Sequence, residues 1–101
     1  MQFVFRGVLD PTKREVRTET RPDHLRYQMG FETLTGGPLI DGDDEATGSL
    51  TIFEADDLAA AQARIDGDPY MVAGIFSSWS LDAVRLLVWA DTPQSLRKDP
   101  S

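Results

Sequence analysis

The sequence contains no cysteine and a single histidine. Without cysteine, the chain can form no disulfide framework, no thiol nucleophile and no cysteine metal site, and one histidine offers no credible zinc site. The acidic run 41–45 looks like part of a calcium loop but fails the pattern, because Ala46 stands where the invariant glycine is required. We therefore expect no bound metal and no cofactor.

Positive charge is also scarce. Seventeen acidic residues oppose ten basic ones, which gives a net charge of −7. A protein that binds the phosphate backbone needs clustered Lys and Arg, so a nucleic-acid partner is not expected. No apolar run approaches the length of a membrane span, and the start Met1–Arg6 has no signal-peptide pattern. The sequence predicts a cytoplasmic protein without a membrane partner.

The chain is short, with 101 residues, of which 41% are hydrophobic. These values are typical of one folded domain, and a core of this size makes oligomerisation an expectation. We expect the domain to cover residues 1–90. Residues 91–101 are polar, contain two prolines and are predicted to form a C-terminal tail.

The first half of the chain predicts a strand followed by a short helix. Residues 3–9 are apolar on both faces of a predicted strand, which Asp10-Pro11 ends, and 13–17 form a charged connection. Thr20 can cap a helix that has Pro22 in its first turn. The predicted helix covers residues 21–29 and stops at Gly30.

The second half predicts a hairpin, a second helix and a last strand. Gly36-Gly37-Pro38 and Gly48-Ser49 frame the hairpin, whose loop is 41–45. Asp56 or Asp57 caps the second helix, which ends at Gly67. The remaining predicted elements are strands at 31–35, 49–53 and 79–89, the last partly interrupted around Asp82, and one helical turn from Asp68-Pro69 to near Gly74.

The resulting order β-α-β-β-α-β predicts a ferredoxin-like α+β fold, an antiparallel sheet with two helices on one face. The first and last strands carry apolar side chains on both faces, among them Val4, Val8 and Val84. Two helices cover only one face. The sequence therefore predicts a homodimer joined through the other sheet face, with a cleft between sheet and helices in each subunit.

His24 is the first candidate site residue, since imidazole is the side-chain group whose ordinary pKa lies near neutrality. A general acid or base at the start of a helix is one interpretation, and a surface histidine is the alternative. Asp68 precedes Pro69, so a plain helix cap would explain it. Ser49, Tyr70 and Gly37 are candidate substrate-binding residues, although turn geometry and packing would also account for them.

The motifs Arg21-Pro22-Asp23-His24 and Asp68-Pro69-Tyr70, with Gly36-Gly37-Pro38-Leu39 and Gly48-Ser49 between them, resemble the YciI-like (YCII-related) family. The resemblance runs from about His24 to Trp79. It implies a dimeric α+β barrel in which Asp68 pairs with His24 as a catalytic dyad. One departure is that the stretch between His24 and Gly37-Pro38 is about one helical turn shorter than in typical members, so a truncated first helix would widen the cleft or change what covers it.

Two functions follow as hypotheses. The first is a small-molecule enzyme, an isomerase or lyase, that moves a proton or eliminates a leaving group on a small cyclic or enolisable compound without a cofactor. The resemblance implies this through muconolactone-isomerase-like proteins and dehydrochlorinases of the same fold. The second is a non-catalytic small-molecule binder or accessory module, in which His24 still lies in the cleft.

Overall fold

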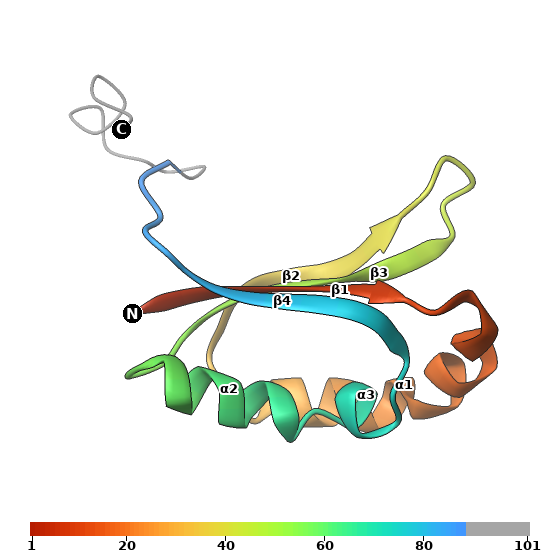
Figure 1. Cartoon of the computed structure of the whole chain (residues 1–101), viewed down its shortest axis with the longest axis horizontal. Coiled ribbons are helices and arrows are strands. Elements are labelled where there is room, and N and C mark those ends of the chain that lie inside the picture. Colours follow the sequence, from red (N-terminus) through yellow and green to blue (C-terminus); the bar gives the residue numbers. More distant parts are fainter. Residues whose placement is uncertain (89–101) are drawn as a thin grey trace.

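A computed structural model describes residues 1–88, in which the strands form one antiparallel sheet and the helices lie on one face of it (Figure 1). The strand order is β2-β3-β1-β4, the ferredoxin-like order, so the predicted fold class is confirmed. The elements are β1 (Gln2–Leu9), the short 3₁₀ turn η1 (Pro11–Lys13), α1 (Arg14–Met29), β2 (Thr33–Ile40), β3 (Ala46–Glu54), α2 (Leu58–Asp66), α3 (Pro69–Val72) and β4 (Phe76–Val84).

The covered face of the sheet holds the main core. Alternation along β1 turns Phe3, Phe5 and Leu9 toward the helices, where all three are buried. The ring of Phe3 stacks with that of Phe53, which comes from the neighbouring strand β3. Ala61 and Ile65 of α2 close this cluster. Full burial of each such aromatic or aliphatic side chain contributes about 1.5–3 kcal/mol.

The opposite face of the sheet carries aliphatic side chains that the helices do not cover. The register places Val4 beside Ile52, and both are half-buried. Arg6, on the same face, is exposed. The two-sided apolar pattern predicted for the first strand is therefore present, with one side packed and one side open.

The first helix begins earlier than predicted. Asp10 caps the chain after β1, because its side chain accepts from Thr12 N at 2.9 Å, and Pro11 occupies the first turn. The helix then continues through Pro22, which lies inside α1 instead of starting it. The predicted charged connection at 13–17 and the predicted helix start at residue 21 are both wrong, because α1 already begins at Arg14. The predicted stop at Gly30 is correct.

The hairpin also differs from its prediction. Gly36, Gly37 and Pro38 lie within β2 and do not frame the turn, and proline is tolerated there because β2 is an edge strand. The turn itself is the predicted loop at 41–45. Its Asp41 carboxylate accepts from the backbone N–H of Asp43 and Glu45.

The remaining elements follow their predictions more closely. Asp57 caps α2 and Gly67 ends it, while Asp68 caps the one-turn helix α3. The strand β4 runs from Phe76 to Val84, earlier than predicted, and passes Asp82 without the expected interruption. Leu86–Val88 therefore follow the strand instead of extending it. Trp89, the boundary at residue 90 and the tail 91–101 lie outside the described residues.

The described part of the chain contains no helix with both the length and the apolar composition needed to cross a bilayer.

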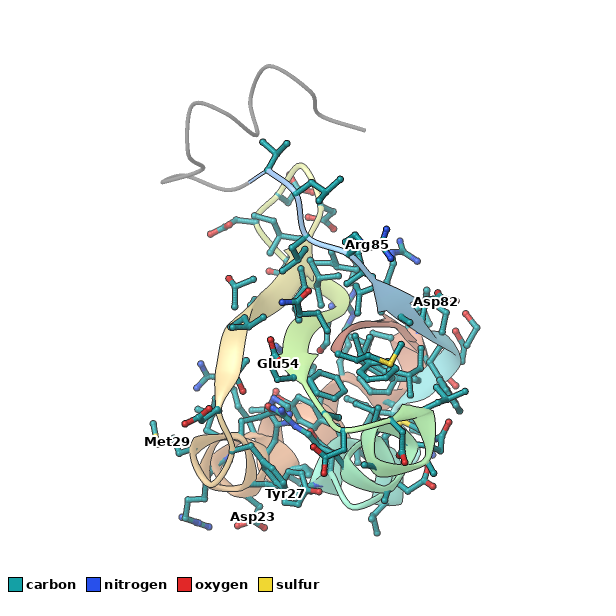
Figure 2. All side chains as sticks on the ribbon, turned by 90° about the vertical axis from the view of Figure 1, so that its left-hand side faces the viewer. Asp23, Tyr27, Met29, Glu54, Asp82 and Arg85 are labelled. Atoms are coloured by element: carbon teal, nitrogen blue, oxygen red, sulfur yellow. The ribbon has the colours of Figure 1, made fainter. Side chains whose placement is uncertain are left out.

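Figure 2 looks along the sheet from one end, with α1 below the β2 side and α2 below the β4 side. The side chain of Tyr27, labelled there, lies between the two helices, and its hydroxyl donates to the Arg64 carbonyl oxygen at 2.7 Å. This bond joins the two helices across the layer.

Candidate active site

The site is built on the cap of α3. Asp68 is the N-cap residue, and its Oδ1 accepts from Tyr70 N at 2.8 Å. Only 5% of Asp68 is exposed. A carboxylate buried this deeply must be fully hydrogen-bonded, because desolvation of an unpaired charge is costly. Local cap geometry thus fixes an acidic group beneath α1.

His24 supplies the second half of the pair. Its Nδ1 lies 2.8 Å from Asp68 Oδ1 and 2.9 Å from Oδ2, although 44 residues separate the two in the chain. An ionised carboxylate only accepts, so Nδ1 carries the proton in this bond, and in the neutral imidazole Nε2 is then the nitrogen with the free lone pair. The imidazole stacks on the ring of Tyr70, with centroids 3.8 Å apart and an interplanar angle of 12°. The ring is therefore held both at its edge and on one face.

Gln28 joins the pair to a buried arginine. Its Nε2 donates to Asp68 Oδ2 at 2.7 Å, and its Oε1 accepts from an Arg64 guanidinium nitrogen at 2.9 Å. These two partners orient the amide unambiguously, because one end faces an acceptor and the other a donor. The result is a chain of hydrogen bonds from Arg64 through Gln28 and Asp68 to His24.

Arg64 is buried, and none of its hydrogen-bond partners in the described part of the chain is a carboxylate. Its guanidinium donates to Thr33 Oγ1 and the Glu32 carbonyl oxygen, and it lies over the rings of Phe31 and Phe53 at 4.7 and 4.2 Å from their centroids. Burial lowers the pKa of Arg64, while the phenol of Tyr27 and the charge of Asp68 act in the opposite direction. Arginine remains charged in such surroundings, so the positive end of the hydrogen-bond chain is permanent.

A cavity of about 410 Å³ lies between α1 and the β2–β3 part of the sheet. Volumes of this order are typical of small-molecule sites. Its lining combines the imidazole, arginines, hydroxyls, apolar side chains and the glycines of β2: Arg17, Arg21, His24, Leu25, Gln28, Met29, Phe31, Thr33, Gly36, Gly37, Pro38, Ser49, Leu50, Thr51 and Tyr70. Asp68 borders a separate void of about 10 Å³, so the imidazole stands between the carboxylate and the larger cavity.

The structure brings together all five residues singled out from the sequence. His24, Ser49, Tyr70 and Gly37 line the same cavity, and Asp68 supports His24. A Cβ atom at Gly37 would meet no atom within 4 Å, and the register places it on the same face of the sheet as Leu50 and Arg6, so Gly37 lines the cavity with its backbone. The cleft between sheet and helices predicted from the sequence is present.

Tyr70 differs from the other candidates because its hydroxyl is buried. The ring is 2% exposed, and the hydroxyl has no hydrogen-bond partner among the described residues. Burial raises the pKa of Tyr70, and the nearby positive charges of Arg17 and Arg21 partly oppose that rise. At neutral pH the phenol is therefore uncharged, and the ring serves chiefly as a platform for the imidazole.

Sequence reasoning missed Arg17, Gln28 and Arg64, and it used Arg21 only as part of a motif. The missing signal was periodicity. Arg17, Arg21, His24 and Gln28 are spaced i, i+4, i+7 and i+11, which places them on one side of a helix. That stripe is visible only if the helix starts near Arg14. No group of three metal-ligating side chains gathers anywhere in residues 1–88.

Comparisons with known proteins agree with this architecture. The family model described as the YCII-related domain matches residues 1–83. The chain is 40% identical over 77 residues to the protein YciI of Escherichia coli and to that of Shigella flexneri, an alignment that covers 66% of this chain and 79% of each relative. Among solved structures, it is similar to the 5-chloro-2-hydroxyhydroquinone dehydrochlorinase TftG of Burkholderia phenoliruptrix, in complex with 2,5-dihydroxybenzoquinone. That match has a TM-score of 0.79 and 25% identity, and it covers 84% of this chain and 94% of the other.

Proposed function

We propose, from the premise that this chain belongs to the YCII-related family, that it is a small-molecule enzyme in which His24 transfers a proton without a cofactor. The substrate is a small cyclic or enolisable compound, and the reaction is an isomerisation or an elimination. The observation that carries the proposal is the bond from His24 Nδ1 to Asp68 at 2.8 Å, with the same imidazole lining the cavity.

The proposed chemistry follows from the tautomer. With Nδ1–H bound to Asp68, Nε2 accepts a proton from a substrate carbon next to a carbonyl, and the electron pair of that C–H bond moves to form an enolate. Asp68 stabilises the imidazolium that results. In an isomerisation Nε2–H returns the proton to another carbon. In an elimination the electron pair expels a leaving group as an anion, and the proton passes to solvent.

The structural neighbour supports this class of reaction. TftG is named a dehydrochlorinase, and its structure holds a hydroxylated quinone. Loss of HCl from 5-chloro-2-hydroxyhydroquinone is an elimination on a ring compound, and at 25% identity the match supports the reaction class more than the individual substrate. For this chain we propose the same class, with Ser49, Tyr70 and Gly37 on the cavity wall as the substrate-binding residues.

The test is deuterium exchange into enolisable cyclic ketones and chloride release from 5-chloro-2-hydroxyhydroquinone, measured on the full chain. His24→Ala should lower the rate by roughly 10²–10⁴-fold, as for other general acid–base groups. Asp68→Asn should lower the rate with little loss of stability, because asparagine still caps α3. Asp68→Ala should lower both the rate and the stability, because alanine provides neither the cap nor the partner of His24.

A second outcome would favour the alternative function. If a probe binds but His24→Ala leaves its turnover unchanged, or if wild type binds these compounds without turning any of them over, the imidazole is not a proton-transfer group. The chain would then be a non-catalytic binding or accessory module. Unfolding curves on each variant separate this outcome from loss of the fold.

We also propose that the protein is a homodimer joined through the open sheet face. The supporting observation is the half-buried aliphatic surface that the register gathers there, formed by Val4, Val8, Leu39, Ile52 and Val84. A stable interface should bury at least about 1,200 Å² in total. Light scattering at micromolar concentration should give twice the monomer mass, and a monomeric mass would reject the dimer. The domain boundary at residue 90 and a cytoplasmic location stay predictions from the sequence.

A further inference from the structure

We propose that the cavity binds a small organic anion, a carboxylate or an enolate on a ring, and that Arg17 and Arg21 hold its charged oxygen atoms. The inference rests on the proposed function, because it names the substrate class of the same site. It depends on four observations of the cavity: its charge, the free guanidinium groups, their spacing and their position relative to His24.

The charge of the cavity is opposite to that of the molecule. The chain carries 17 acidic and 10 basic residues, yet within residues 1–88 no aspartate or glutamate lines the cavity, whereas Arg17 and Arg21 do. Asp68 borders only the separate small void. A concave wall with charges of one sign concentrates ligands of the other sign. The lining therefore favours anions although the net charge of the chain is negative.

Neither arginine is occupied by the protein itself. In the described part of the chain, Arg14 and Arg64 donate to carbonyl or side-chain oxygens and Arg26 pairs with Asp23, but neither Arg17 nor Arg21 forms a hydrogen bond or ion pair. Two like charges four residues apart weaken a helix by a few tenths of a kcal/mol. Apart from the position of Arg17 over the Tyr70 ring, the pair makes no such contact within residues 1–88, so both guanidinium groups remain available to a ligand.

The spacing suits a two-oxygen group. Residues four apart on a helix have Cβ atoms roughly 5–6 Å apart, so both guanidinium groups can approach one carboxylate or the two oxygens of an enolised ring. Planar guanidinium groups bind such oxygen pairs with fixed geometry. A single arginine would bind the charge but would orient the ring less well.

The position relative to His24 connects binding to chemistry. The Arg17 guanidinium carbon lies 5.8 Å from the Tyr70 ring centroid, and the His24 ring stacks on the same ring. Arg21 precedes His24 by one helical turn. When Nε2 removes a proton, negative charge develops on the substrate oxygen, and fixed cations nearby stabilise it. Leu25, Met29 and Phe31 provide an apolar wall for the uncharged part of the ring.

Calorimetry with matched probes tests the inference. The anions are benzoate and 2,5-dihydroxybenzoquinone, and their uncharged counterparts are benzamide and 2,5-dimethoxybenzoquinone. Wild type should bind each anion more tightly than its counterpart, and the difference should shrink when NaCl rises from about 20 mM to about 500 mM. The double variant Arg17→Gln/Arg21→Gln should bind the anions roughly 10- to 100-fold more weakly, with less than about 3-fold change for the neutral probes.

Arg26→Gln is the control, because it removes the same charge from the same helix but at a residue that does not line the cavity. If the double variant does not fold, the two single variants carry the test. Equal affinity for anions and neutral probes in wild type, no effect of Arg17 and Arg21, or no anion binding at millimolar concentration would each overturn the inference. His24→Ala should still bind the anions but should lose turnover. Turnover therefore tests the proposed enzyme function, and calorimetry tests the proposed anion site, so failure of either proposal is seen separately.

Discussion

The layer between sheet and helices has two halves that are filled in different ways. Under α2, Phe3, Phe5 and Phe53 are buried and pack against Ala61 and Ile65. Under α1, the space facing β2 holds a cavity of about 410 Å³, and nearly every residue of β2 is exposed. The same layer is therefore a packed aromatic core on one side and an open cavity with charged, polar and apolar lining on the other.

The difference originates in the strand sequences. The strand β1 places a large apolar residue or glycine at each inward position, whereas the middle of β2 reads Gly36-Gly37-Pro38 and offers no bulky side chain. Helix α1 places arginine, histidine and glutamine side chains on the side of the helix that faces this part of β2. Stability and binding are thus assigned to separate halves, and Arg64 lies at their junction, over Phe53 on one side and Phe31 on the other.

The largest expected effect comes from Phe53→Ala compared with Phe31→Ala. Both rings contact the Arg64 guanidinium, so loss of that contact is matched between the variants. Phe53 is fully buried and Phe31 is 42% exposed. Phe53→Ala should lower the free energy of unfolding by about 3–5 kcal/mol because it leaves a cavity in the core. Phe31→Ala should cost under about 1 kcal/mol. Urea unfolding measures both, and equal losses would refute the division of the layer.

The next effect concerns the hydrogen-bond chain at the junction. Gln28→Leu removes the amide that joins Arg64 to Asp68 and leaves both buried charges short of a partner. It should destabilise the fold by about 1–3 kcal/mol and lower the rate of proton transfer, because Asp68 no longer holds the imidazole as firmly. Gln62→Leu is the control, since it removes an exposed glutamine bond on α2. If Gln28→Leu leaves the rate of proton transfer unchanged, the hydrogen bonds that link Arg64 to His24 have only a structural role.

A smaller effect on stability is expected when the cavity is filled. Ser49 lines it from β3, and Ser49→Leu should place an apolar side chain in the open space. The free energy of unfolding should change by less than about 1.5 kcal/mol, while benzoate binding is lost. Ser49→Ala separates bulk from the hydroxyl, because it removes the hydroxyl without filling the cavity. Retained binding in Ser49→Leu would show that ligands do not enter beside this residue.

The smallest effect at neutral pH is expected for Tyr70→Phe. Its hydroxyl has no partner in the described part of the chain, whereas that of Tyr27 donates to the Arg64 carbonyl. Tyr70→Phe should therefore leave stability unchanged or slightly higher, and Tyr27→Phe should lower it by about 0.5–1.5 kcal/mol. Equal losses in urea unfolding would show that the Tyr70 hydroxyl is satisfied.

The same pair of tyrosines predicts a response to alkaline pH. Burial raises the pKa of both phenols above the ordinary 10.0. The unfolded chain then loses these protons first, so stability is fully present below about pH 10 and declines as pH rises toward the folded-state pKa values. Tyr70→Phe should make the decline shallower. The free energy of unfolding of wild type and Tyr70→Phe, measured from pH 8 to 11, checks how steeply stability declines with pH.

Much of the frame could be read from local sequence. A run of apolar residues predicted β1, the expected caps Asp56 or Asp57 and Asp68 predicted where α2 and α3 begin, and the order of elements predicted the ferredoxin-like sheet. The candidate residues His24 and Asp68 were identified through resemblance to a family, since local rules by themselves favour a surface histidine for the first and a plain helix cap for the second.

Two signals misled the local reading, for the same physical reason. Pro22 favours a helix start, yet α1 continues through it, and a strand interrupted by Gly36-Gly37-Pro38 favours a turn, yet β2 continues through it at the sheet edge. Propensities are weak terms that contacts to the rest of the fold can override. The periodic stripe that contains His24 and Gln28 becomes visible only once α1 has its full length.

The sequence by itself determined the kinds of groups available: one imidazole, no thiol, a capping aspartate and an excess of negative charge. Only the tertiary structure decided which of them meet. The contact between His24 and Asp68 spans 44 residues, and that between Gln28 and Arg64 spans 36. Such pairings depend on how the helices pack across the sheet, which is a property of the whole core and is not encoded in any short segment.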